Sequence, residues 1–191
     1  MRKIILASAS PRRSELLRQI GLKFEVEPSN HEEDISPHLK PRKLAMSISC
    51  QKAMAVASKY NNAIIIAADT FIVFRGKIMG KPTTEAGARK MLTILSGKVH
   101  SVITGFTIID ADENKVLSKS VETKVHLKRL TIEEINAYVK SQEPLDKAGA
   151  YAIQGLGSVL VAKIEGDYFN VIGLPLCALT ESLKEFGIYI L

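Results

Sequence analysis

The chain has 191 residues, of which 46% are hydrophobic and 24% are charged, as is usual for a soluble globular protein with one sizeable core. It contains no apolar run of about eighteen residues, which excludes a transmembrane helix, and the apolar part of its N-terminus, residues 4–7, is too short for a signal peptide. The net charge of +6 suits either a nucleic-acid binder or an enzyme that acts on polyphosphate substrates.

Two features favour the enzyme. The basic residues are spread along the chain, and the aromatic content is only 6% with no tryptophan, so no stacking platform for single strands is evident. Cys50 and Cys177 lie in no zinc or redox spacing, which predicts a reduced, cytoplasmic protein. No repeat or linker divides the sequence, so we expect a single domain over residues 1–191.

The first predicted elements are a strand over residues 3–7 and a helix that begins after Ser10. Ser8, Arg12 and Arg13 then lie at a helix N-terminus directly after a strand, where free N–H groups attract anions. Arginines in the first turn of a helix oppose its dipole. A bound phosphate therefore explains these arginines better than a solvated helix face does.

A short strand over residues 24–26 precedes an acidic loop over residues 28–37 that carries Glu33. The loop is either solvated or a source of metal ligands, because hard cations prefer carboxylate oxygen. Residues 41–59 are predicted to form a helix with Lys52 on its buried side. Lys52 there either extends past the apolar face or points into a polar site.

Residues 64–68 read IIIAA, an apolar run rich in β-branched side chains that predicts a strand buried on both faces. We expect this strand to end at Asp69 and Thr70. Ligands in open α/β sheets bind at the carboxyl ends of strands, so these two residues are candidates for a binding or catalytic site. A second short strand over residues 71–74 and a turn would bring Lys81 back towards the acid. A lone aspartate is more often a turn residue than a catalytic one, but the surrounding cations favour catalysis here.

The rest of the chain completes an α/β pattern. Its predicted elements are a helix capped by Thr83 or Thr84, strands over 99–109 and 117–130, a helix opened by the capping box Thr131 and Glu134, a hairpin over 158–172, and a final helix after Pro175. His100 has no second histidine at ligand spacing and is interpreted as structural. The glycine-rich segment 143–157 is either a plain connection or a functional loop. We expect a long curved mixed sheet of about eight strands with helices on both faces.

Seven short motifs follow one another along almost the whole chain: SASPRR (8–13), ADT (68–70), GKP (80–82), HSVIT (100–104), DKAGAY (146–151), IQG (153–155) and GLPL (173–176). Together they resemble the Maf family of nucleotide pyrophosphatases, first linked to septum formation. The resemblance implies an inosine-triphosphatase-like α/β fold and a divalent cation, Mg²⁺ or Mn²⁺. It also implies cleavage of a nucleoside triphosphate to the monophosphate and pyrophosphate.

The resemblance also implies roles for individual residues. Asp69 would activate the attacking water and hold the metal together with Glu33, although Glu32-Glu33 stands where the family often has Asp-Glu. The residues implied to bind the phosphates are Ser8, Arg13, Lys52 and Lys81. The residues that match the branch acting on dTTP and UTP, and that would shape the base pocket, are Arg12, Thr70 and Gln154. Lys147 also fits that branch.

One alternative is the paralogous branch that acts on 7-methyl-GTP. The alternative from another class is a non-catalytic regulator of septum formation or a nucleic-acid binder. A binder has no need for Asp69 among lysines, so we expect a small nucleotide rather than nucleic acid or a membrane as the partner. Whether the protein forms a homodimer is left open.

Overall fold

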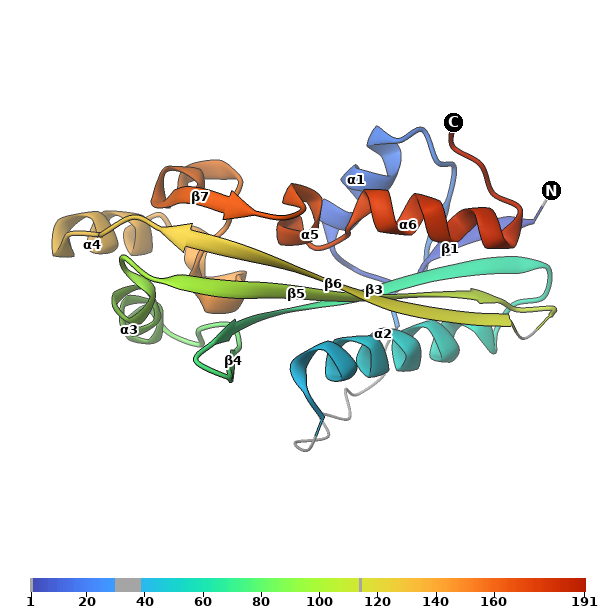
Figure 1. The fold of residues 1–191 in the computed structure, drawn as a ribbon, viewed down its shortest axis with the longest axis horizontal. Helices are drawn as coiled ribbons and strands as arrows, with labels where there is room; N and C mark the ends of the chain where they lie inside the picture. The colour runs from blue at the N-terminus through green and yellow to red at the C-terminus, as the bar shows by residue number, and fades with distance from the viewer. Residues whose placement is uncertain (1, 30–38, 114) are drawn as a thin grey trace. The chain divides into compact units, whose positions relative to one another are not determined.

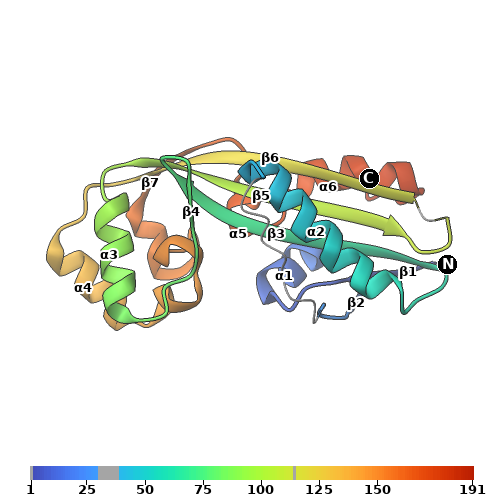
Figure 2. The same cartoon turned by 90° about the horizontal axis from the view of Figure 1, so that it is seen from below.

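A computed structural model describes residues 2–29, 39–113 and 115–191 (Figures 1 and 2). Its strands are β1 (Lys3–Leu6), β2 (Glu25–Val26), β3 (Ala63–Phe74), β4 (Lys77–Met79), β5 (Val99–Asp110), β6 (Lys115–Leu127) and β7 (Val161–Glu165). Its α-helices are α1 (Pro11–Gln19), α2 (Pro41–Ala57), α3 (Glu85–Leu95), α4 (Ile132–Lys140), α5 (Tyr168–Ile172) and α6 (Leu176–Leu183). Short 3₁₀ helices are η1 (Glu143–Asp146), η2 (Ala148–Ala150), η3 (Gly155–Leu160) and η4 (Lys184–Phe186).

The strands form one mixed sheet in the order β2-β1-β3-β5-β6-β7, with β4 paired to β3. β1 pairs in parallel with both β2 and β3, whereas the β3–β4 and β6–β7 pairs are antiparallel. The predicted α/β fold with a mixed sheet flanked by helices is therefore confirmed. The described helices are all too short or too polar to cross a bilayer.

The chain divides into two compact units. The first contains the chain up to Thr70 together with Thr104–Val121 and Gly173–Leu191, and the second contains Phe71–Ile103 and Glu122–Ile172. One domain over residues 1–191 stays a prediction.

In the first unit, α2 covers one face of the sheet, and α1 and α6 lie on the other side (Figure 1). Ala53 and Val56 of α2 pack in one apolar cluster with Ile65 and Ala67 of β3. Successive side chains of a strand point to opposite faces, so Asp69 shares the α2 side with Ile65 and Ala67. Thr70 consequently faces the side of α1.

In the second unit, α3 and α4 pack on the strands around an apolar core that includes Leu92, Val125 and Tyr138. Both helices begin at the predicted caps. The side chain of Thr84 accepts a hydrogen bond from the backbone N–H of Gly87 at 3.1 Å, and Thr131 and Glu134 form a reciprocal capping box.

The prediction that the apolar strand ends at Asp69 is wrong. β3 continues without interruption through Asp69 and Thr70 to Phe74, because its last three residues pair with β4. The turn to β4 is made by Arg75 and Gly76, whose φ angles are 49° and 76°. The pairing of β3 with β1 stops at Ile66, and Asp69 and Thr70 lie between that segment and the segment paired with β4.

The hairpin predicted over residues 158–172 is also wrong in its second arm. Residues 168–172 form the short helix α5, and β7 pairs with β6 instead. The cause is local, because the Asp167 carboxylate accepts hydrogen bonds from the backbone N–H groups of Phe169 at 2.7 Å and Asn170 at 3.2 Å. An aspartate that caps two such groups starts a helical turn.

Candidate active site

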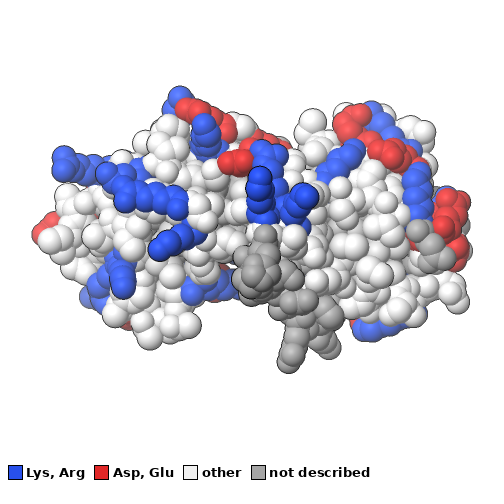
Figure 3. Space-filling model, turned by 60° about the horizontal axis from the view of Figure 1, so that its bottom comes forward, with Lys and Arg blue, Asp and Glu red and all other residues white. Residues whose placement is uncertain are grey.

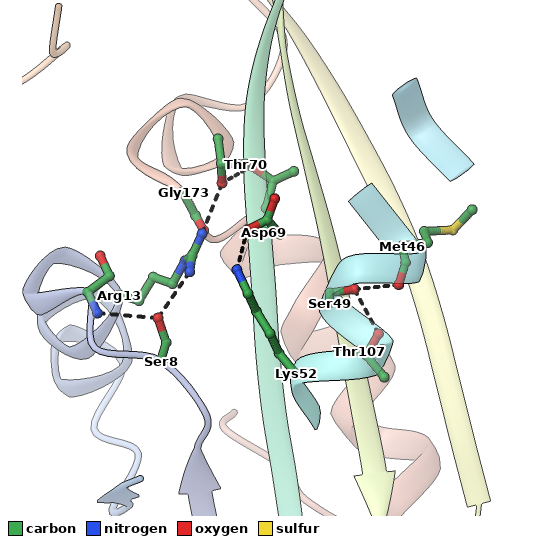
Figure 4. A network of polar contacts seen from close by, with 11 residues as sticks. Ser8, Arg13, Met46, Ser49, Lys52, Asp69, Thr70, Thr107 and Gly173 are labelled. Atoms are coloured by element: carbon green, nitrogen blue, oxygen red, sulfur yellow. Dashed lines mark hydrogen bonds and ion pairs between the residues drawn. The ribbon is translucent and has the colours of Figure 1, made fainter. Parts of the chain in front are cut away.

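A buried ion pair joins α2 to β3 in the first unit (Figure 4). Nζ of Lys52 lies 2.5 Å from Oδ1 of Asp69, and the two side chains expose only 15% and 11% of their surface. Of the two alternatives for Lys52, the structure has the one in which the lysine points into a polar site. A buried carboxylate is costly unless it is paired with a cation, so Lys52 stabilises the ionised form of Asp69.

The guanidinium of Arg13 is held by three partners from distant parts of the chain (Figure 4). It donates from Nη1 to the Ser8 hydroxyl at 3.0 Å, from Nη2 to the Thr70 hydroxyl at 3.2 Å, and from Nε to the carbonyl oxygen of Gly173 at 2.9 Å. The Thr70 hydroxyl lies 2.9 Å from that of Thr104. We call Arg13, its three partners and Thr104 the Arg13 network.

The short connection between β1 and α1 explains why Ser8 and Arg13 meet. The backbone N–H of Ala7 still bonds the carbonyl of Ile66 at 2.8 Å, and α1 begins four residues later behind Ser10, which has an extended backbone. Ser8 therefore lies between a strand and a helix, is buried, and faces the first turn of α1. This is the predicted arrangement of Ser8 and Arg13 at a helix N-terminus.

Two members of the Arg13 network were missed from the sequence. Thr104 is fully buried, and Gly173 adopts a φ of +124°, where a Cβ would lie 3.4 Å from the Thr70 hydroxyl. Both residues lie in the motifs quoted above. No local pattern shows that the Gly173 carbonyl bonds Arg13 or that the Thr104 hydroxyl bonds Thr70, because these partners are distant along the chain.

The position of Lys52 depends on how closely α2 approaches β5. A Cβ added to Gly105 would lie 2.2 Å from the backbone carbon of Ala45, so only glycine fits under this helix. One turn further on, the buried Ser49 hydroxyl lies 2.8 Å from the Thr107 hydroxyl, and Figure 4 shows this pair beside Lys52. The close contact and the hydroxyl pair fix α2, and hence the start of the Lys52 side chain.

The other predicted site residues lie in different parts of the chain. Arg12 is half-buried in the first unit and makes no hydrogen bond or ion pair within residues 2–29, 39–113 and 115–191. Lys81, which is exposed, and Gln154, which is half-buried, belong to the second unit, so their place in the site stays a prediction. Glu33 lies outside the described residues. The metal site stays a prediction too, since the described part of the chain has no group of three acidic, histidine or cysteine ligands.

Comparison with known proteins places this arrangement in a family. The model of the Maf-like protein family matches residues 3–186. The chain belongs to the Maf family. This Maf protein is 49% identical over 191 residues to the dTTP/UTP pyrophosphatase of Methanosarcina barkeri (strain Fusaro / DSM 804), covering 100% of this chain and 97% of that protein. It is 50% identical over 188 residues to the dTTP/UTP pyrophosphatase of Bacillus cereus (strain AH820), covering 98% and 97%.

The fold of this Maf protein is shared more widely. The structure of the Staphylococcus aureus Ham1 protein aligns with a TM-score of 0.50 at 13% identity, covering 84% of this chain and 80% of that one. At this level of identity the similarity concerns the fold alone. The fold and family that the seven motifs implied are thus confirmed.

Proposed function

We propose that this protein hydrolyses dTTP and UTP to the nucleoside monophosphate and pyrophosphate. The relatives that are 49% and 50% identical over nearly their whole length are both named dTTP/UTP pyrophosphatases. The observation that carries the proposal is the buried Asp69 carboxylate, which is paired with Lys52 and directly precedes a member of the Arg13 network. A buried acid that is paired with a lysine is suited to activating water beside a polyphosphate.

In this mechanism a water molecule attacks the α-phosphorus, and the bond to the bridging oxygen of the leaving pyrophosphate breaks. Asp69 orients the water and accepts its proton, and Lys52 keeps the carboxylate ionised and aimed. The transition state needs positioning and neutralisation of charge more than covalent chemistry. Ser8, Arg13 and Lys81 supply hydrogen bonds and positive charge to the phosphate oxygens.

The donor set is compatible with Mg²⁺ or Mn²⁺. Asp69 offers carboxylate oxygen, and Glu33 is the second ligand that we propose. Mg²⁺ is commonly held by one or two carboxylates together with substrate phosphates, so the absence of a larger acidic cluster from the described residues is no obstacle. When bound, the cation would neutralise charge on the phosphates.

We infer that Arg12, Thr70 and Gln154 select the base. A glutamine amide has both a donor and an acceptor, and uracil and thymine present an N3–H beside a carbonyl. In the structure the Thr70 hydroxyl already bonds Arg13 and Thr104, so Thr70 would link the base pocket to the phosphate-binding arginine.

A free nucleotide in the cytoplasm, rather than a nucleic-acid strand, is the substrate that we infer. Basic side chains are scattered over the face shown in Figure 3, with acidic side chains among them. A track for a nucleic-acid backbone usually gathers Lys and Arg along one groove or face.

The proposal is tested by separating the products of UTP hydrolysis with Mg²⁺ present. We expect UMP and pyrophosphate in equal amounts, whereas UDP and orthophosphate as the main products would contradict the proposal. A panel of dTTP, UTP, CTP and 7-methyl-GTP measures base preference. A DNA-binding titration with the same sample tests the regulatory alternative, which tight binding without any hydrolysis would favour.

A further inference from the structure

Glu143 occupies an unusual position in the second unit, at the start of η1. Its Oε1 accepts hydrogen bonds from the hydroxyl of Tyr138 at 2.8 Å and from the backbone N–H of Gly157 at 2.9 Å. Its Oε2 accepts from the backbone N–H of Leu156 at 3.0 Å. One carboxylate therefore holds the backbone of a segment thirteen to fourteen residues further along the chain.

Tyr138 of α4 extends this arrangement to the other side of the same segment. Tyr138 is 6% exposed, and its hydroxyl oxygen also accepts a hydrogen bond from the backbone N–H of Ala152 at 3.2 Å. Glu143 and Tyr138 thus fix residues on both sides of Gln154, with Ala152 before it and Leu156 and Gly157 after it.

The two glycines of this segment leave no spare room. Gly155 has a φ of +65°, and a Cβ added there would lie 2.7 Å from Oε2 of Glu143. A Cβ on Gly157 would lie 2.3 Å from the carbonyl oxygen of Ala152 and 2.5 Å from the hydroxyl of Tyr138. Because no other residue allows this close approach, the backbone here is shaped around the carboxylate and the phenol.

The charge of Glu143 matters to these bonds. Burial alone would raise the pKa of the Glu143 carboxyl, but the N–H groups of Gly157 and Leu156 and the hydroxyl of Tyr138 hold that pKa below its ordinary value. The group is therefore an ionised acceptor at neutral pH, with all three donors pointed at it. A glutamine at this position would turn an N–H₂ group towards at least one of those donors.

Gln154 itself differs from its neighbours. It is half-buried, and its side-chain amide makes no hydrogen bond to the residues that the structure describes, whereas the backbone on either side is fixed. We propose that Glu143 and Tyr138 are positioning residues that hold the Gln154 amide ready for the edge of a uracil or thymine base. The inference rests on the proposed function, in which Gln154 selects the base.

The test compares UTP with CTP, which differ only at the base edge that Gln154 is proposed to bind. In Gln154→Ala, the ratio of kcat/KM for UTP to that for CTP should fall at least about fivefold, because a lost buried hydrogen bond costs about that much. Glu143→Gln and Tyr138→Phe should each lower the same ratio. Introduced into Gln154→Ala, neither should lower it further, because residues that act through one amide are not additive.

Two further measurements separate positioning from a general loss of stability. Hydrogen exchange at the amides of Leu156 and Gly157 should be faster in Glu143→Gln. The matched control is Glu134→Gln, because Glu134 also accepts from a backbone N–H, that of Thr131 at 2.9 Å, but does not bond the segment with Gln154. This control should lower stability without changing the UTP to CTP ratio. Tyr138→Phe removes a single hydroxyl, so it provides an answer if Glu143→Gln fails to fold.

The outcomes distinguish the two proposals. If Gln154→Ala leaves the ratio unchanged, Gln154 does not select the base, and its proposed role and the positioning inference both fail. If Gln154→Ala lowers the ratio but Glu143→Gln and Tyr138→Phe lower kcat/KM for UTP and CTP in parallel, only the positioning inference is overturned.

Discussion

Lys52 Nζ and Asp69 Oδ1 lie 2.5 Å apart across the contact between α2 and β3, with both side chains almost fully buried. The pair sets the charge state and direction of the carboxylate that we propose as general base. Asp69→Asn keeps the size of the side chain but removes the charge, and general base catalysis contributes about a hundred- to ten-thousandfold. We expect kcat for UTP to fall by that order while the circular dichroism spectrum is unchanged.

The control for this substitution is Asp110→Asn. Asp110 is also buried and forms an ion pair with Arg2, but it lies at the end of β5 and has no role in the proposed reaction. The Asp110→Asn protein should be less stable than the wild type and should have the same kcat. A folded Asp69→Asn protein with normal kcat would remove Asp69 from the mechanism.

Removing only the lysine of the pair should destabilise the fold. Lys52→Met leaves a buried carboxylate without this cation, and breaking a buried pair typically costs about 3–5 kcal/mol. Adding Asp69→Asn to Lys52→Met should recover part of that loss. Urea unfolding of the wild type, both single variants and the double variant gives the coupling energy, and an additive result would show that the pair contributes nothing to stability.

Thr104 should matter for phosphate binding although it is completely buried. Thr104→Val removes the hydroxyl that lies beside that of Thr70 and so loosens one support of the Arg13 guanidinium. We expect a higher KM for UTP and weaker inhibition by pyrophosphate, by about five- to tenfold, from the loss of a buried hydrogen bond. Thr104→Ser keeps the hydroxyl and should restore both values, whereas equal effects of valine and serine would indicate a packing role only.

Gly105→Ala should be among the most damaging single-methyl additions in the chain. The added Cβ would meet the backbone of Ala45, which cannot turn aside as a side chain can. Overpacking of this kind costs about 1–3 kcal/mol or more, and α2 would move together with Lys52. The matched control is Gly80→Ala, because a Cβ at Gly80 meets nothing within 4 Å. Thermal unfolding should separate the two variants clearly, and similar melting temperatures would contradict the contact.

His100 should make stability depend on pH. The side chain is buried and lies 2.6 Å from the Tyr151 hydroxyl, and burial, with a smaller effect of His126, lowers the pKa of His100 from 6.5 to about 4. The unfolded chain therefore binds a proton below pH 6.5 that the folded protein does not bind until about pH 4. Stability is lost as the pH falls through this window, by up to about 3 kcal/mol.

His100→Gln removes this titrating group. The difference in unfolding free energy between wild type and His100→Gln, measured by urea at pH 7 and about pH 4.5, should change in favour of the variant at the lower pH. His126→Gln is the control, because His126 is 29% exposed and pairs with Glu165 at the surface. A difference that does not change with pH would show that His100 does not titrate in this window.

Local chemistry explains which parts of the fold could be predicted. Neighbouring residues in the sequence set where α1, α3 and α4 begin, after Ser10, Thr84 and Thr131. They also set the buried stretch before Asp69. These predictions were confirmed. The length of β3 depends instead on its pairing with β4, and the start of α5 depends on which backbone groups Asp167 caps. At β3 the apolar pattern did not show where the strand stops. At residues 168–172 it did not distinguish a strand from a short helix, because both can carry the same apolar pattern.

The candidate site shows the same division. Ser8 and Arg13 were predicted together because both lie at the N-terminus of a helix that directly follows a strand. Lys52 was placed on the buried side of its helix, which left open whether it extends past the apolar face or points into a polar site. Thr104 meets Thr70 and Gly173 meets Arg13 only through the folded chain, at separations of 34 and 160 residues. Glu143 was missed for a different reason, because two of its three donors are backbone N–H groups, which every residue except proline has.

The adjacency of Asp69 and Thr70 also limits how this protein can change over evolution. A deletion of one residue earlier in β3 would turn Thr70 towards Lys52 and Asp69 towards Arg13, and would thus exchange an acid for a hydroxyl on both faces at once. A deletion or insertion of two residues preserves the faces. Homologues should therefore vary in length by single residues in the loops at either end of β3 and in β4, and within β3 only by even numbers. Sorting natural sequence insertions by parity along this strand would show whether selection has enforced that rule.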